Sequence, residues 1–184
     1  MKISFNSPVV LTFVIIASLE LLTNTLTHGA VGGYFVAPGR LSQLSIMALP
    51  QSVLHVFGHA DIDHLVGNMM FILLLGPILE EKYGSMSLLC MIVVTAVFTA
   101  FLNAFFFSSG ILGASGLVFM MIVLSSFTNV KTGTFPATFV FVIIFYFGKE
   151  IYQSFTPSNV SHFAHILGGC FGGVFGLFFS RSKK

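Results

Sequence analysis

The sequence predicts an all-α membrane protein, a compact bundle of six transmembrane helices in a single domain spanning residues 1–184, with a short central fourth helix. Two observations carry this prediction. Hydrophobic residues make up 55% of the chain and charged residues only 8%, with a mean hydropathy of +0.97, whereas soluble domains contain about 25% charged residues. The apolar residues also fall into runs close to the roughly 20 residues that a helix needs to cross a bilayer.

Six apolar runs are the candidate spans. They cover residues 9–26, 64–79, 86–107, 115–127, 135–155 and 160–179. A signal peptide is the alternative for the first run, but Glu20 interrupts it and no small-residue cleavage site follows. We therefore expect the first run to remain as a helix of the bundle.

Two segments do not fit simple spans or loops. Residues 29–63 are too polar and too often broken by Gly and Pro to cross, yet residues 44–57 are apolar enough to lie in the interface. We expect a partly embedded outer loop there. The short fourth run follows the apolar pair Ile111-Leu112, which suggests that the chain dips into the membrane before the helix begins. Irregular backbone at that depth needs protein or a water-filled cavity around it, so we expect a pocket at Ser115.

The basic residues set the predicted orientation. With a cytoplasmic N-terminus, six of the eight Lys and Arg residues lie on the inner side, as the positive-inside rule requires. They are Lys2, Lys82, Lys131, Arg181, Lys183 and Lys184. Both termini are then cytoplasmic, and the second, fourth and sixth spans enter from the outer side. His64, Ser115 and His165 should consequently lie at similar depth near the outer leaflet.

The segment Gly113-Ala114-Ser115-Gly116 is a short polar interruption between two apolar runs. Small residues are common where membrane helices pack closely, so packing alone is one explanation for it. Ionisable side chains within spans, in contrast, usually mark functional sites. Four of the six histidines gather at the predicted outer side, namely His55, His59, His64 and His165. His28 and His162 are expected to be core residues with satisfied hydrogen bonds.

Other residues carry less information. His64 and Asn68 are four residues apart, which places an imidazole and a carboxamide on one helix face. Cys90 and Cys170 lie in apolar runs without metal or redox spacing, so both are expected to be packing residues. The net charge of +2 gives no indication of nucleic-acid binding.

These motifs together carry a family resemblance. The chain contains, in order, His55-x3-His59-x4-His64-x3-Asn68, Gly113-x-Ser115-Gly116 and Ala164-His165-x2-Gly168-x3-Gly172. This succession resembles the signatures of the rhomboid intramembrane serine proteases and covers nearly the whole chain. The resemblance implies a rhomboid-like fold and a serine endopeptidase that cuts membrane proteins in or near their transmembrane segments.

The resemblance also assigns roles to residues. Ser115 would be the nucleophile and His165 the general base of a Ser-His dyad, which agrees with the need of a serine hydroxyl for a base within hydrogen-bond reach. Asn68, His64 and the backbone N–H of Ser115 would stabilise the oxyanion. The remaining motif residues would support the site, as scaffold, packing or water-retaining residues. They are Gly113, Gly116, Phe119, His55, His59, Gly168 and Gly172.

Two features depart from the family pattern. Phe119 stands where the family often has a tyrosine that packs on the catalytic histidine, so the ring is kept and the hydroxyl is lost. The chain has no Trp, and Pro50-Gln51 occupies the place of a Trp-Arg pair of many bacterial members. No carboxylate is expected to join the dyad, because Asp61, Asp63 and Glu150 are interpreted as interfacial or loop charges.

Three other functions remain open. A catalytically inactive rhomboid-like protein that binds membrane clients would share the fold, although such relatives typically lack the serine or the histidine. A metal-dependent protease would use His55, His59 and His64, but this sequence has no HExxH motif and no well-placed carboxylate pair. A small transporter should show inverted repeats or paired broken helices, which this sequence does not.

The expected partners are transmembrane protein substrates and the lipid bilayer, and no cofactor or metal is expected. The expected location is a bacterial plasma (inner) membrane, as a multi-pass protein. The sequence carries no indication of oligomeric state.

Overall fold

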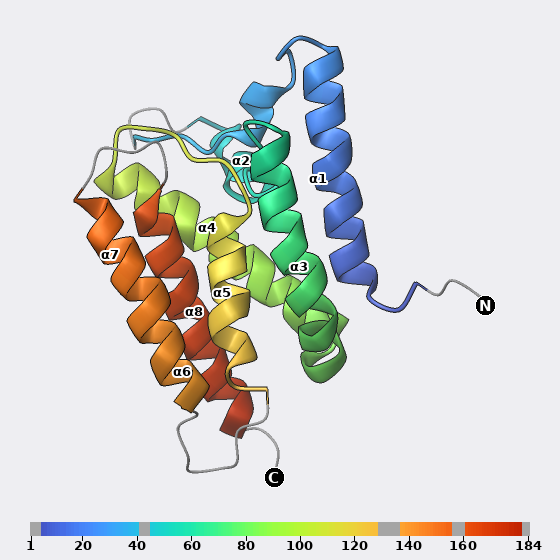
Figure 1. Cartoon of the computed structure of the whole chain (residues 1–184). Coiled ribbons are helices and arrows are strands. Elements are labelled where there is room, and N and C mark those ends of the chain that lie inside the picture. The colour runs from blue at the N-terminus through green and yellow to red at the C-terminus, as the bar shows by residue number, and fades with distance from the viewer. Residues whose placement is uncertain (1–4, 41–44, 129–136, 156–160, 182–184) are drawn as a thin grey trace.

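The computed structural model describes residues 5–40, 45–128, 137–155 and 161–181, which form an α-helical bundle (Figure 1). Its elements are, in order, α1 (Pro8–Leu26), η1 (Gly32–Phe35), α2 (Ala48–Leu54), α3 (Ile62–Tyr83), α4 (Ser85–Phe106), α5 (Ser115–Ser125), α6 (Ala137–Val142), η3 (Ile143–Phe147), α7 (Gly148–Ser154) and α8 (His162–Arg181). Within the described residues, α1, α3, α4 and α8 are long and apolar enough to cross a membrane. The shorter α5 is also apolar.

The helix bounds differ from the predicted runs where local chemistry sets them. Helix α3 begins at Ile62 because Asp61 caps it, with Oδ1 accepting a hydrogen bond from the His64 N–H at 2.8 Å. Asp61 is therefore a helix cap, and its interpretation as a loop or interfacial charge was incomplete. The helix continues past the predicted end at residue 79 to Tyr83, where Gly84 with φ of +86° ends it. Helix α5 ends at Ser125, two residues before the predicted end.

The predicted fifth run is helical but irregular. Helices α6 and α7 are joined by η3, a π-helical segment, so residues 137–154 form one succession of helical segments. The predicted starts of this run at residue 135 and of the sixth run at residue 160 lie outside the described residues. A π-helical insertion shifts the helix face on which later residues lie.

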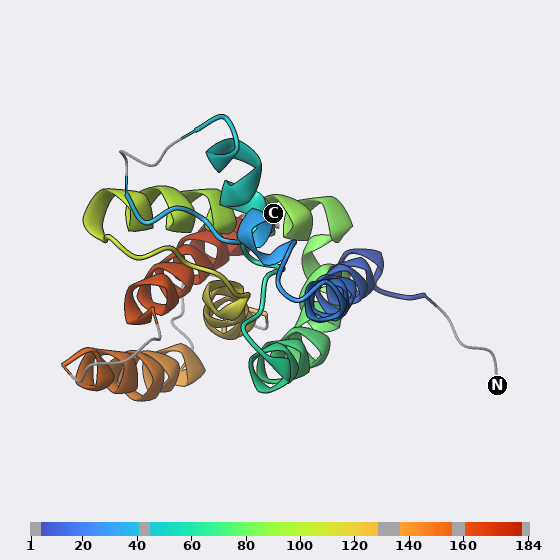
Figure 2. The same cartoon turned by 90° about the horizontal axis from the view of Figure 1, so that it is seen from above.

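The helices that carry His64, Ser115 and His165 all begin at the same end of the bundle. Helix α1 begins and α8 ends at one end, whereas α3, α5 and α8 all begin at the other (Figure 1). Viewed from above, α5 lies between α3, α4 and α8, with α1 on one flank and α6 and α7 on the other (Figure 2). Eight of the eleven α5 residues are buried. Helix α5 is thus largely enclosed by protein from Gly116 onward.

Helices α5 and α8 pack backbone against backbone. A β-carbon on Gly168 would overlap the carbonyl oxygen of Gly116, and one on Gly172 would overlap the carbonyl oxygen of Met120. Gly173 is less crowded, since a β-carbon there would lie 3.9 Å from Val123. The expected close approach through small residues is therefore present, and it is concentrated at positions 168 and 172 of α8.

Three side chains expected in the interior lie on the surface. Cys90 and Cys170 are both exposed, and so is His28, which follows α1 with φ of +51°. The two cysteine predictions were wrong because an apolar run in a membrane helix has apolar residues on all its faces, including those turned toward lipid. His28 was predicted wrongly because the chain leaves α1 at Leu26, before reaching it.

A buried carboxylate fastens α1 to the rest of the bundle. Glu80, at the end of α3, accepts hydrogen bonds from the backbone N–H groups of Val9 and Val10 at 3.0 Å each. The Ser85 hydroxyl donates a third bond to it at 2.7 Å. The N–H groups of a first helical turn have no partner within their helix, and a negative charge is favourable there. Glu80, on the neighbouring helix α3, therefore supplies the hydrogen-bond acceptors that the first turn of α1 lacks.

We expect Glu80→Ala to lower the free energy of unfolding by about 2 kcal/mol, because hydrogen bonds to a charged group are lost and buried N–H groups stay unpaired. Thermal unfolding of the purified protein in detergent measures this change. Glu81→Ala is the matched control, since Glu81 is exposed on the next position of α3. Equal midpoints for the two variants would contradict the role of Glu80.

Candidate functional site

A cavity of about 1250 Å³ lies where α3, α5 and α8 begin. His64, Ser115 and His165 all line it, together with His55 and residues of α4. Exposed residues such as Ala60 also line it, so the cavity reaches the protein surface. The pocket expected at Ser115 is present, and it brings together three of the residues that the motifs singled out.

The backbone before Ser115 is held by three contacts. Ala37 and Ile111 exchange two backbone hydrogen bonds, of 2.9 and 3.0 Å. The Asn103 side chain donates to the Ser109 carbonyl at 2.9 Å. The N–H of Gly113 donates to the His55 carbonyl at 2.8 Å. Backbone groups of Ser109, Ile111 and Gly113 thus bond to other protein groups, which irregular backbone inside a membrane would need.

Gly113 is required at its position for two reasons. Its φ of +111° belongs to the region that disfavours a side chain. A β-carbon there would also lie 2.7 Å from Cε1 of the His64 ring. This close fit places the His64 imidazole beside the turn that leads into Ser115.

Ser115 is the first residue of α5 and is partly exposed toward the cavity. Its neighbour Ala114 is the N-cap and makes no side-chain capping bond. The first N–H groups of a helix lack partners within the helix, and together with the helix dipole they favour a negative charge. The cavity thus contains a hydroxyl next to a group of backbone donors.

His165 lies in the first turn of α8, buried and packed on an aromatic ring. Its imidazole stacks on Phe119 with ring centroids 4.4 Å apart and an interplanar angle of 8°. The ring packing expected from Phe119 is therefore present. Within the described residues no hydrogen bond joins Ser115 to His165, although both line the cavity. Such bonds are often long in a site without substrate and tighten when it binds.

The two predicted oxyanion side chains occupy different positions. His64 lines the cavity, whereas Asn68, one turn further along α3, is buried and is not among the lining residues. Nδ2 of Asn68 is buried without a hydrogen-bond partner. Such a donor is costly to leave unpaired.

His55 and His59 act as scaffold in this structure. The His55 ring nitrogen Nδ1 lies 3.3 Å from the Gln51 carbonyl, and Nδ1 of His59 lies 2.9 Å from the Phe57 carbonyl. Burial lowers the pKa of each histidine to about 4, despite these bonds. Both imidazoles are therefore neutral near pH 7.

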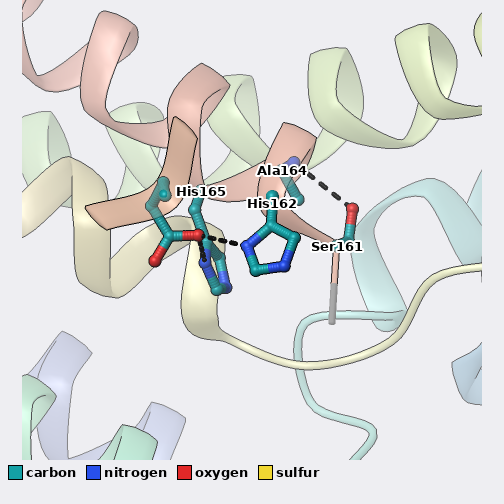
Figure 3. Close-up of polar contacts among 5 residues, drawn as sticks. Ser161, His162, Ala164 and His165 are labelled. Carbon is teal, nitrogen blue, oxygen red and sulfur yellow. Dashed lines mark hydrogen bonds and ion pairs between the residues drawn. The ribbon is translucent and has the colours of Figure 1, made fainter. Parts of the chain in front are cut away.

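The structure overturns the interpretation of Glu150 as an interfacial or loop charge. Glu150 lies in α7 and is 3% exposed. Its Oε2 lies 2.8 Å from Nδ1 of His165 and 2.7 Å from Nδ1 of His162 (Figure 3). His162 is partly buried, and its ring has the partner expected of a satisfied histidine. The only signal in the sequence was a charged residue within an apolar run.

These three residues are also the group best placed to hold a metal ion. The donor atoms of Glu150, His162 and His165 lie within 4.8 Å of one another. Among the described residues, those of His55, His59 and His64 do not form such a group. The bonds of 2.7 and 2.8 Å around one oxygen are hydrogen-bond distances, so the cluster is satisfied by its own members.

The neutral, buried His55 should make stability depend on pH. Its pKa is about 4 in the folded protein against 6.5 in the unfolded chain, so the unfolded state binds the proton first and stability falls as the pH drops from 6.5 toward 4. Between pH 7 and pH 5 the loss expected from His55 alone is about 2 kcal/mol. Thermal unfolding in detergent across this range measures it.

His55→Gln should remove about half of this pH dependence of stability, because His59 still contributes, whereas His28→Gln should leave it unchanged because His28 is exposed. An identical slope in the His55→Gln protein would exclude His55 as its source. His59→Gln should reduce the pH dependence of stability over the same interval, since the pKa of His59 is also about 4.

Residues 48–182 match the family model of the Rhomboid domain. The match begins at α2 and includes every residue that lines the cavity, whereas Ala37, which bonds to Ile111, precedes it. Among curated proteins, none matches this chain.

Proposed function

Because the chain belongs to the rhomboid family, we propose that it is an intramembrane serine endopeptidase that hydrolyses peptide bonds in or near the transmembrane segments of other membrane proteins. Family membership and the four long apolar helices make it an integral membrane protein. The observation that carries the proposal is that Ser115 and His165 line one cavity beside the contact of α5 with α8.

In the proposed reaction, Ser115 Oγ attacks the carbonyl carbon of the scissile peptide and its proton passes to Nε2 of His165. The carbonyl electrons move to oxygen and give a tetrahedral oxyanion. Collapse of that intermediate breaks the C–N bond, and His165 returns the proton to the leaving amine. Water then attacks the acyl-serine ester in the same way, with His165 as base, and releases the new carboxyl group.

The proposed oxyanion donors are the backbone N–H of Ser115 and the side chains of His64 and Asn68. Three features support them: the first turn of α5 opens onto the cavity, His64 lines it, and Nδ2 of Asn68 is unpartnered. Donors of this kind act most strongly where bulk water is excluded. Entry of substrate into the cavity would provide that exclusion.

The proposed topology has six spans, with α5 and the α6–η3–α7 succession added to the four long helices. Both termini would be cytoplasmic, in a bacterial plasma membrane. The cavity would then lie toward the outer leaflet, and the substrate would be cut near the outer end of its transmembrane helix. Such a helix must unwind locally, because its carbonyl groups are otherwise hydrogen-bonded.

Ser115→Ala and His165→Ala should each abolish cleavage of a model single-pass substrate by the purified protein, because either change removes a group that the reaction needs. Gel analysis of the cleavage products measures this. A fluorophosphonate probe should label the unchanged protein and not Ser115→Ala. An unlabelled, inactive but folded wild-type protein would instead favour the alternative, a rhomboid-like protein that binds clients without cutting them.

Asn68→Ala should lower kcat on the order of 10²- to 10³-fold, the usual effect of losing one oxyanion donor. KM should change little, because the donor acts mainly on charge that develops in the transition state. Steady-state cleavage kinetics separate the two constants. The matched control is Asn24→Ala on α1, away from the cavity. Equal kinetics for both variants would remove Asn68 from the site.

A further inference from the structure

The role of Glu150 is not accounted for by a Ser-His dyad. This carboxylate is 3% exposed and lies in an otherwise apolar region, where a charged group is retained only with strong partners. Its partners in the described residues are the imidazoles of His162 and His165. The bond of 2.8 Å to Nδ1 of His165 connects it directly to the proposed general base.

Close packing brings Glu150 within reach of α8. A β-carbon on Gly169 would overlap the ring of Phe147, so η3 lies directly against α8 at this point. Glu150 follows Phe147 by three residues, which places both on the same side of a helical segment. The absence of a side chain at position 169 therefore allows the carboxylate to approach Nδ1 of His165.

The bond to Glu150 determines which nitrogen of His165 can act as a base. An ionised carboxylate only accepts hydrogen bonds, so Nδ1 must carry the proton. The lone pair then lies on Nε2. The ring is also fixed on its face by the stack on Phe119. One contact thus sets the tautomer, and two contacts together set the orientation of the imidazole.

We propose that Glu150 is a positioning residue that holds His165 in the Nδ1–H tautomer and stabilises the imidazolium formed when Ser115 gives up its proton. This inference rests on the proposed function. Glu150 itself remains ionised and takes no proton during the reaction. The other charged or titratable groups close to His165 are His162 and Lys149, and His162 shares the same carboxylate oxygen.

The first test compares Glu150→Gln with Glu81→Gln, the same change at an exposed glutamate on α3. Glu150→Gln should lower kcat by about 10³- to 10⁴-fold with little change in KM, because an amide can stabilise the wrong tautomer. Glu150→Asp keeps the charge and should recover part of that loss. Wild-type kcat in folded Glu150→Gln, or equal losses in the Gln and Asp variants, would overturn the proposal.

The second test does not depend on proteolysis. NMR spectra of ¹⁵N-histidine-labelled protein should show a downfield Nδ1–H proton for His165 that disappears in Glu150→Gln. Persistence of that signal in Glu150→Gln, or Nε2–H in the wild type, would overturn the proposal even if the protein is inactive. If the signal behaves as expected in a protein that cleaves nothing, the proposed function fails and the hydrogen bond stands.

A metal-bound cluster is distinguished by a third measurement. Activity of the wild-type protein should be unchanged by a chelator and should not need added Zn²⁺. Loss of activity with chelator and recovery with Zn²⁺ would show that Glu150, His162 and His165 hold a metal ion, and would overturn the positioning role.

Discussion

The site depends on the direct backbone contact between α5 and α8. At this contact Gly168 lies against the carbonyl oxygen of Gly116, with no space for a β-carbon. Ser115 precedes Gly116, and His165 precedes Gly168 by less than one helical turn. Because the two backbones touch there, their first turns open onto one cavity. A larger residue at position 168 would push α5 and α8 apart and so increase the distance between the side chains of Ser115 and His165.

The irregular segment before α5 is organised around the same region. Its backbone groups bond to Ala37, in the loop that follows α1, and to His55, at the end of α2. Irregular backbone inside a membrane would need such partners. The buried imidazoles of His55 and His59 contribute no charge to this region near pH 7, since their pKa values are about 4. The electrostatics of the cavity therefore depend on His64, His165 and the residues around them.

Sequence reasoning located the start of α5 at Ser115 and placed that of α3 within two residues, because Ser115 and His64 each stand where a polar group meets an apolar run. It did not place Glu150. The residue lies beyond the π-helical segment η3, and a π-helical insertion changes which face a residue occupies in a way that hydrophobic periodicity does not reveal. Its pairing with His165 also depends on the packing of two helices, which spacing along one helix cannot predict. The rule applied to the histidines, that a charge inside an apolar run needs a reason, applied equally to Glu150.

The paired backbone bonds between Ala37 and Ile111 link two segments that are far apart in the sequence. Residue 111 lies four positions before Ser115, and residue 37 belongs to the loop that follows α1. A displacement of the loop at residue 37 would therefore also strain the backbone that leads into Ser115. A movement that begins in the loop after α1 would in this way reach the interior of the protein.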